Sequence, residues 1–387
     1  MDLANSSSSL TIRSVRAVPV KIARDHGRAQ GTAGSPHALA GKGAYRWSQH
    51  YPALYSVDFE TCLVRVELSD GRVGWGEAQA PLAPEVPAKI VETLLEPVLV
   101  GEAFDASVAR ISDLWWRMYS TMRVRGQTGG FMLDAMAGVD LALWDFVPER
   151  GLRESVPAYV SGVPGSTLEA KLEFVGHYWE QGFRTFKIYF ESDWAALLEL
   201  IDRMQVGFAG IRVAVDALWH LPEDSFVRCG CELADRSVLW LECPLLPEDV
   251  EGHVRLVEES GVRLALGESY RTRYEALPFF DRDIVSFWQP DLGRSGMTET
   301  LALGGLARER GIAIVPHVSI AMPPQLNAAI RAAKTIPNCS LLEYNPSVVE
   351  MVNRYAVSPV ELRGGAYFAG AGKLGGADWV RLAGEMG

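Results

Sequence analysis

The first 150 residues change from a strand-like to a helix-like spacing of apolar positions. Residues 10–22 alternate apolar and polar side chains, as a strand does. Two further alternating runs within 61–78 flank Asp70-Gly71, and an Asp-Gly pair between such runs is typical of a hairpin. The helices that the later spacing predicts span 87–98, 105–121 and 130–146. Strands first and helices after predict an α+β domain over residues 10–150.

From residue 156 onward, short apolar or β-branched runs alternate with longer amphipathic stretches. The eight runs span 156–162, 183–189, 211–216, 238–242, 262–268, 284–291, 312–317 and 340–344. Repeated strand–helix units pair their strands in parallel, and eight of them predict a closed (β/α)₈ barrel of the TIM type. We therefore expect a barrel domain over residues 151–355. A Gly-rich C-terminal segment, 356–387, is expected to pack back on the first domain.

Two segments follow neither period. Residues 1–9 are predicted to be a disordered tail, and the Gly-rich residues 23–50 are predicted to form a mobile loop. A loop that closes over a barrel mouth can bind the distal end of a substrate and exclude water. The candidates within it are His26, Arg28, His37, Lys42, Arg46, Trp47 and His50. For any single one of these residues, a solvated surface position is an equally good interpretation.

Composition narrows the class of function. The chain has 48 acidic against 37 basic residues, a formal net charge of −11, which disfavours binding to nucleic acid or to an anionic membrane. The first residues lack the basic start and apolar core of a signal peptide, and no apolar run approaches the roughly 20 residues that span a bilayer. The five scattered cysteines suit reduced thiols. We expect a cytoplasmic homo-oligomer. If its substrate is an anion, fixed local positive charge must hold it, and a metal is one source.

Three carboxylates end successive predicted barrel strands. Asp216, Glu242 and Glu268 each lie 26 residues after the last, one strand–helix unit apart. The carboxyl ends of barrel strands converge on one mouth, where carboxylates this close would repel one another unless a cation lies between them. Oxygen ligands alone favour Mg²⁺ or Mn²⁺ over zinc. A lone acidic residue at a strand end more often caps a helix or faces water, but three in register predict a metal site.

Other strand ends carry a second group of candidates. Lys187 and Tyr189 alternate onto the same face of the second strand. Asp291 ends the sixth strand, His317 ends the seventh and Glu343 lies on the eighth. A carboxylate beside an imidazole fixes its tautomer and raises its basicity, which is the usual arrangement for a general base. A single histidine in a barrel is, however, more often a packed structural residue.

Taken together, these segments resemble the enolase superfamily and, within it, the mandelate racemase subgroup. The matching segments are LVRVELSDGRVGWGEA (63–78), AGVDLALWD (137–145), GFRTFKIY (182–189), VAVDALW (213–219), WLECPL (240–245), LGES (266–269), QPDLGRSG (289–296), VPH (315–317) and LLEY (341–344). They are spread over nearly the whole chain, and as a set they are specific.

The resemblance implies an α+β capping domain on the barrel and one essential Mg²⁺ per subunit. The metal ligands it implies are Asp216, Glu242 and Glu268. It also implies that Asp291 and His317 form an acid/base dyad. Glu343 would be a neutral carboxyl that hydrogen-bonds an enolate, which Lys187 would stabilise from the other side. Sites of this superfamily use a Lys or His base with Mg²⁺ to stabilise such a species.

Four positions depart from the subgroup's pattern: Tyr189 in place of a second lysine, Leu218, Cys243 and Met297. A tyrosine at this position occurs in members that dehydrate acid sugars. The resemblance therefore favours dehydration of a polyhydroxy acid to a 2-keto-3-deoxy acid. Tyr189 would act as a phenolate base, its pKa lowered from about 10 by Lys187 and the metal, or would only hydrogen-bond a ligand. Racemisation or epimerisation of a 2-hydroxy acid, and an inactive binding barrel, are the alternatives.

Overall fold

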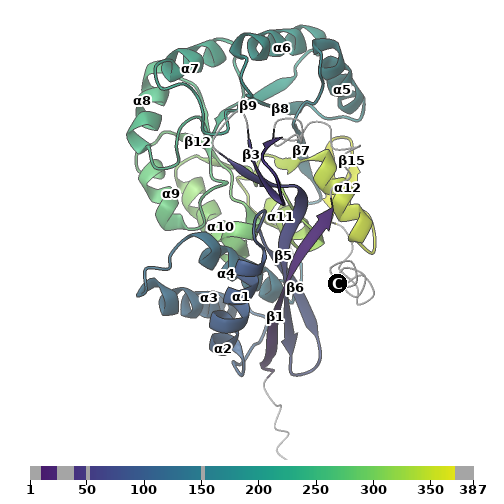
Figure 1. Cartoon of the computed structure of the whole chain (residues 1–387), viewed down its shortest axis with the longest axis vertical. Helices are drawn as coiled ribbons and strands as arrows, with labels where there is room; N and C mark the ends of the chain where they lie inside the picture. The colour runs from purple at the N-terminus through teal and green to yellow at the C-terminus, as the bar shows by residue number, and fades with distance from the viewer. Residues whose placement is uncertain (1–9, 24–38, 49–52, 150–152, 371–387) are drawn as a thin grey trace, which may run out of the picture.

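A computed structural model describes residues 10–23, 39–48, 53–149 and 153–370. Figure 1 shows a domain of sheet and helices at one end of the molecule and a barrel ringed by helices at the other. The residues 1–9, for which a disordered tail was predicted, lie outside the described part. Within that part, no helix is both long enough and apolar enough to cross a membrane.

The capping domain combines an antiparallel sheet with a group of helices. Its strands are β1 (Ile12–Ala23), β5 (Asp58–Leu68) and β6 (Val73–Ala78), in the order β1-β5-β6. Its helices are α1 (Glu85–Ile90), the π-helical turn η2 (Val91–Leu95), α2 (Glu96–Leu99), α3 (Val108–Arg123) and α4 (Gly130–Trp144). The predicted hairpin is confirmed. Helix α4 is buried on almost every side because it packs against β6 and against the barrel helix α10 (Leu292–Glu309).

A second small sheet occupies part of the segment for which a loop was predicted. Strands β2 (Leu39–Ala40), β3 (Tyr45–Ser48) and β4 (Leu54–Ser56) pair antiparallel in that order. The hydroxyl of Tyr45 holds this sheet to the capping domain, since it donates to Glu60 at 3.1 Å and accepts the backbone N–H of Ala83 at 3.0 Å. Strands of two to four residues among glycines leave no readable alternation in the sequence.

The barrel confirms the predicted architecture. Its strands are β7 (Val156–Ser161), β8 (Thr185–Tyr189), β9 (Arg212–Asp216), β10 (Leu241–Glu242), β11 (Leu264–Leu266), β12 (Val285–Trp288), β13 (Ala313–Ile314) and β14 (Leu342–Tyr344). The helices between and after them are α5 (Leu168–Glu180), α6 (Trp194–Gly207), α7 (Phe226–Asp235), α8 (Val250–Ser260), α9 (Arg273–Phe280), α10, α11 (Pro323–Thr335) and α12 (Pro346–Tyr355). Strands β7 to β13 pair in chain order and β14 pairs in parallel with β7. A parallel bridge between Ile314 and Cys339 closes the ring.

The C-terminal hairpin differs from the predicted packing on the capping domain. Strands β15 (Glu361–Arg363) and β16 (Ala366–Ala369) form it, and β16 pairs antiparallel with the barrel strand β7. The fully buried side chain of Tyr367 fixes the hairpin there, because its hydroxyl donates to the carbonyl of Glu343 at 3.1 Å. Residues 371–387 lie outside the described residues, so the packing expected for them stays a prediction.

Candidate active site

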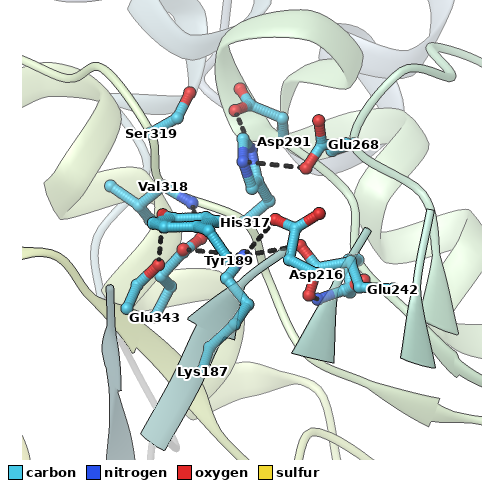
Figure 2. Close-up of polar contacts among 12 residues, drawn as sticks. Lys187, Tyr189, Asp216, Glu242, Glu268, Asp291, His317, Val318, Ser319 and Glu343 are labelled. Atoms are coloured by element: carbon cyan, nitrogen blue, oxygen red, sulfur yellow. Dashed lines mark hydrogen bonds and ion pairs between the residues drawn. The ribbon is translucent and has the colours of Figure 1, made fainter. Parts of the chain in front are cut away.

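The pairing register of the barrel lines up polar side chains at the carboxyl ends of β8, β9 and β10. Tyr189 pairs with Asp216, and Asp216 pairs with Glu242. Residues in register on parallel strands project to the same side of the sheet, so these three side chains meet at the mouth. Lys187 lies one alternation earlier on β8, opposite Ser161 at the end of β7. Figure 2 shows Lys187, Tyr189, Asp216 and Glu242 on one side of the two residues that follow β12 and β13, Asp291 and His317.

Three carboxylates converge at this mouth as the sequence predicted. Asp216, Glu242 and Glu268 each bring an oxygen to within 4.8 Å of the others, and the first two are buried. Glu268 follows Gly267, whose φ of +148° and close approach to the backbone of Gln289 leave no room for a side chain. Burial, followed by the charge of Glu242, raises the pKa of Asp216 well above its ordinary value. Clustered, hard oxygen donors with excess negative charge fit a Mg²⁺ ion.

Lys187 is the protein's own cation within this cluster. Its ammonium is 1% exposed and lies 2.5 Å from Glu242, 3.2 Å from Asp216 and 3.3 Å from Glu343. Burial would lower the pKa of this lysine, but the charges of Glu242 and Glu343 outweigh burial and raise it well above its ordinary value. Lys187 is therefore held as an ammonium in this arrangement.

Two uncharged donors that were not predicted from the sequence hydrogen-bond the carboxylate of Glu242. The indole N–H of Trp240 and the side-chain amide of Gln289 both donate to its Oε2, at 2.9 and 2.7 Å. The other oxygen, Oε1, faces Lys187. Partners of this kind orient metal ligands. Gln289 belongs to one of the matching segments, whereas nothing in the spacing of Trp240 marks it as more than a core residue.

His317 and Asp291 form the predicted pair. His317 Nδ1 lies 2.8 Å from Asp291 Oδ2, and its Nε2 lies 3.1 Å from Glu268 Oε2. Burial would lower the pKa of His317, but the negative charges of Glu268 and Glu343 outweigh burial and raise it to about 10. Because Asp291 occupies Nδ1, the nitrogen turned toward the carboxylate cluster is Nε2 (Figure 2). That nitrogen is the one available for proton transfer.

Glu343 lies on the other side of the mouth. Its Oε2 accepts the backbone N–H of Val318 at 2.6 Å, and its Oε1 faces Lys187. Burial raises the pKa of Glu343, but the positive charges of Lys187 and His317 outweigh it, so the pKa is lowered. This arrangement favours the carboxylate and differs from the neutral carboxyl that the resemblance implied.

Tyr189 does not show the lowered pKa that was predicted for it. Its hydroxyl lies 2.9 Å from the hydroxyl of Ser161, and the ammonium of Lys187 lies 5.5 Å from its ring centroid. Burial raises the pKa of the phenol and outweighs the opposing effect of Lys187, so Lys187 alone does not lower it, and the lowering expected from the metal stays a prediction. Ser161 was also missed, although it is the polar residue that ends the first barrel strand.

Two family models together match most of the chain. Residues 48–155 match the N-terminal domain of mandelate racemase / muconate lactonizing enzyme, and residues 172–373 match the enolase C-terminal domain-like family. The chain belongs to the enolase superfamily. Within this superfamily of enzymes it has the features of the mandelate racemase subgroup that the sequence indicated.

Individual relatives agree with this assignment. The D-galactarolactone cycloisomerase of Agrobacterium fabrum is 28% identical over 273 residues, which cover 66% of this chain and 70% of that protein. The D-galactonate dehydratase of Variovorax paradoxus is 27% identical over 321 residues, covering 76% and 80%. A solved structure of an enolase-superfamily member from Agrobacterium tumefaciens superposes with a TM-score of 0.87 at 26% identity, covering 96% of this chain and 98% of that one.

Two of the departures from the mandelate racemase pattern coincide with unusual backbone at the mouth. Leu218 has a φ of +50° and Cys243 a φ of +44°, a region that residues with a side chain seldom adopt. Cys243 directly follows Glu242, and the backbone N–H of Leu218 donates to Asp216 at 3.0 Å. Strained backbone next to two of the three clustered carboxylates is typical of functional sites in enzymes.

The substrate-binding residues proposed in the loop are only partly described. His26, Arg28, His37 and His50 lie outside the described residues. Lys42 is exposed, Trp47 is 59% exposed, and the guanidinium of Arg46 bonds the carbonyl of Gly43 within the small sheet. The binding of substrate by residues 23–50 stays a prediction.

Proposed function

We propose that this enzyme is a Mg²⁺-dependent acid-sugar dehydratase, which removes the α-proton of a polyhydroxy carboxylate and expels the β-hydroxyl as water. The observation that carries the proposal is the dyad: Asp291 holds one nitrogen of His317, and the other nitrogen faces the carboxylate cluster. The dehydratases among the relatives support this reaction class. The product would be a 2-keto-3-deoxy acid.

Each of the clustered residues would have a different role in binding an anionic substrate. Asp216, Glu242 and Glu268 would hold the Mg²⁺, which would supply Lewis-acid stabilisation of the charge that develops on the substrate carboxylate. Lys187 places a fixed ammonium beside that position, where it stabilises negative charge in a buried site far more than it would in water. Glu343 would accept from a donor on the substrate.

His317 would carry both proton transfers on one face of the substrate. The largest of the negative charges that raise the pKa of His317, that of Glu268, would be neutralised when Glu268 holds Mg²⁺, so that Nε2 of His317 would be free to take the α-proton. That transfer breaks the C–H bond and leaves the electron pair delocalised into the carboxylate. The same nitrogen then returns the proton to the β-hydroxyl, and the delocalised electron pair forms the C2=C3 bond as the C3–O bond breaks and water leaves. The resulting enol becomes the keto acid when C3 takes up a proton and the enol hydroxyl releases one. Tyr189 would act as a hydrogen-bond donor, because burial keeps its phenol protonated.

Racemisation or epimerisation of a 2-hydroxy acid is the second candidate. That reaction needs a base on each face of the α-carbon. Figure 2 shows Lys187 reaching the cluster from the side opposite His317, which favours this candidate over others. The three carboxylates around the ammonium of Lys187 weigh against it, since they hold the lysine in its protonated form.

A panel of acid sugars with a keto-acid assay tests the proposal, and D-galactonate is the first compound to try. Dehydration should appear with Mg²⁺ and disappear with a chelator. Inversion at the α-carbon without keto acid would instead establish the racemase. Among variants, His317→Asn should lose dehydration and α-proton exchange with deuterated water, by about 10²–10⁴-fold. Tyr189→Phe should keep exchange. Exchange that survives in His317→Asn and vanishes in Tyr189→Phe would show that Tyr189 is the base.

A further inference from the structure

Helix α11 begins in a way that makes it depend on the capping domain. Its N-cap residue is Met322, which has no side-chain oxygen, and its first two positions are Pro323 and Pro324, which have no N–H. The first turn therefore offers two backbone donors without intrahelical partners, the N–H groups of Met322 and Gln325. Both donate to the carboxylate of Glu77 on capping strand β6, at 2.9 and 3.2 Å. Glu77 caps a helix that belongs to the other domain.

Gln325 connects this cap to the acid/base dyad. Its side-chain amide donates to Asp291 Oδ1 at 3.0 Å, and the backbone N–H of Gly293 donates to the same oxygen at 2.9 Å. With Oδ1 occupied twice, Oδ2 is the oxygen that faces Nδ1 of His317. A carboxylate only accepts, so the amide NH₂ must face Asp291. The amide oxygen of Gln325 is left buried, with no hydrogen-bond partner among the residues that the structure describes.

Burial makes this connection rigid. Glu77, Gln325 and Asp291 are all 0% exposed, so water does not compete for their hydrogen bonds. Glu77 is itself held by the hydroxyl of Thr61 at 2.8 Å on the neighbouring capping strand. Since a polar group left unpaired in such a place is costly, each partner in the series restricts the orientation of the next.

We propose that Gln325 and Glu77 are positioning residues for His317. Glu77 fixes the backbone of Gln325, the amide of Gln325 fixes the carboxylate of Asp291, and Asp291 fixes the tautomer and tilt of the imidazole. The capping domain thus contributes to proton transfer through one residue of α11. The effect on turnover rests on the proposed function, whereas the effect on the imidazole does not.

The first test is a spectroscopic measurement on the full-length, Mg²⁺-loaded protein without substrate. In protein labelled with ¹⁵N at histidine, the Nδ1–H signal of His317 is assigned by its loss in His317→Asn. In Gln325→Met, which keeps side-chain length and removes the donor, this signal should shift, and its exchange with water should speed up by about tenfold or more. Glu77→Gln should move it in the same direction by less. An unchanged signal in a folded Gln325→Met overturns the proposal.

Asp140→Asn is the matched control. Asp140 is also a buried carboxylate of the capping domain that accepts from a barrel helix, here from the backbone N–H and the hydroxyl of Thr298 of α10, and among the described residues no hydrogen bond joins it to Gln325 or His317. It should leave the His317 signal in place, and a signal that moves equally in this variant also overturns the proposal. If Gln325→Met does not fold, Gln325→Asn, whose amide is one carbon too short to reach Asp291, carries the test together with Glu77→Gln.

The second test separates kcat from KM. With D-galactonate, or with whichever acid sugar of the panel the wild-type enzyme turns over, Gln325→Met should lower kcat by roughly ten- to hundredfold, the loss expected for one hydrogen bond to a charged group. KM should stay within about twofold, because Gln325 does not contact the substrate site. An unchanged kcat, or a loss confined to KM, overturns the positioning role. If no acid sugar is turned over but the His317 signal moves, the proposed function fails and the positioning of the imidazole stands.

Discussion

Buried carboxylates gather in two regions of this protein, and the two sets are satisfied differently. At the interface between the capping domain and the barrel, Glu77 and Asp140 accept backbone N–H groups of barrel helices. Asp134 accepts two hydrogen bonds from the guanidinium of Arg271, at 2.8 and 3.1 Å. At the barrel mouth, Asp216, Glu242 and Glu268 instead lie within 4.8 Å of one another, and the first two share the ammonium of Lys187.

The difference distinguishes a structural interface from a site for a ligand. Each interface carboxylate has hydrogen-bond donors of its own in the fold, so no added ion is needed to satisfy its oxygens. The mouth has more acidic groups than cations, so it favours a bound cation, and without one burial and the neighbouring carboxylates raise the pKa of Asp216. Changes at the interface should therefore reduce stability, and changes at the mouth should reduce activity and ion binding.

The largest expected effect is on stability, from Arg271→Met at the interface. Removing the guanidinium leaves Asp134 buried without its hydrogen-bonded cation, and breaking a buried ion pair in this way typically costs roughly 3–5 kcal/mol of unfolding free energy. Denaturant unfolding in Mg²⁺ measures the loss. Asp134→Asn is the control and should cost less, because Arg271 is 14% exposed and can turn toward water. A loss below about 1 kcal/mol would place this pair among ordinary surface salt bridges.

The next largest effect is on activity, from Lys187→Met at the mouth. Turnover of the acid sugar should fall by about 10²–10³-fold, as when one fixed stabiliser of developing charge is removed from an active site. Without Mg²⁺ the variant should also melt below the wild type, because Glu242 and Asp216 lose their cation. Added Mg²⁺ should narrow the gap in melting temperature and should not restore turnover. A variant that keeps turnover would remove Lys187 from the proposed reaction.

Of these two regions, only the residues of the barrel mouth could be predicted from the sequence. The mouth residues could be predicted because charged side chains recur at strand ends with the spacing of a strand–helix unit, as Asp216 and Glu242 do. The interface carboxylates could not, since Asp140 lies within an apolar helical stretch and nothing local shows that it meets another domain. The uncharged donors Trp240 and Gln325 were missed for the same reason. A buried polar partner has no periodic signature.

The secondary structure, too, could be predicted only where the sequence has a readable pattern. The eight barrel strands could be predicted because each is a compact apolar run between helices, whereas the small sheet β2–β4 is too short to show alternation. The C-terminal hairpin joins β7 by backbone pairing of β16 and is fixed by the hydrogen bond of Tyr367 to Glu343 on β14, which is a tertiary contact. The effect of Lys187 on the pKa of Tyr189 was overestimated, because the neighbouring lysine is visible in the sequence and burial is not.

The third prediction concerns the ion. After chelation, adding Mg²⁺ at about a hundredfold excess over its dissociation constant should stabilise the folded protein by roughly 2.7 kcal/mol, since the ion binds only the native state. Glu268→Gln, which removes one of the clustered carboxylates, should lose most of this gain. Arg271→Met should keep it despite a lower starting stability. Isothermal calorimetry measures the dissociation constant of Mg²⁺, and thermal melts measure the stabilisation. A melting temperature that does not change with Mg²⁺ would rule out a metal site at the mouth.

The smallest effect is a pH dependence of stability that comes from the interface. Burial raises the pKa of Glu77 and of Asp140 to about 7 each, from ordinary values of 4.5 and 3.8, although the hydrogen bonds they accept act in the opposite direction. Between those ordinary values and about 7, the native protein keeps protons that the unfolded chain has released. Their contribution to stability is therefore fully present at low pH and is lost as the pH rises through 7. The slope for each group cannot exceed about 1.4 kcal/mol per pH unit.

Urea unfolding of the wild type, Glu77→Gln and Asp140→Asn from about pH 5 to about pH 8, at constant Mg²⁺, measures this slope. Each variant should show a flatter decline than the wild type, because the mouth carboxylates contribute equally to all three proteins. Parallel declines would mean that the N–H donors, and not burial, determine the ionisation of these two carboxylates.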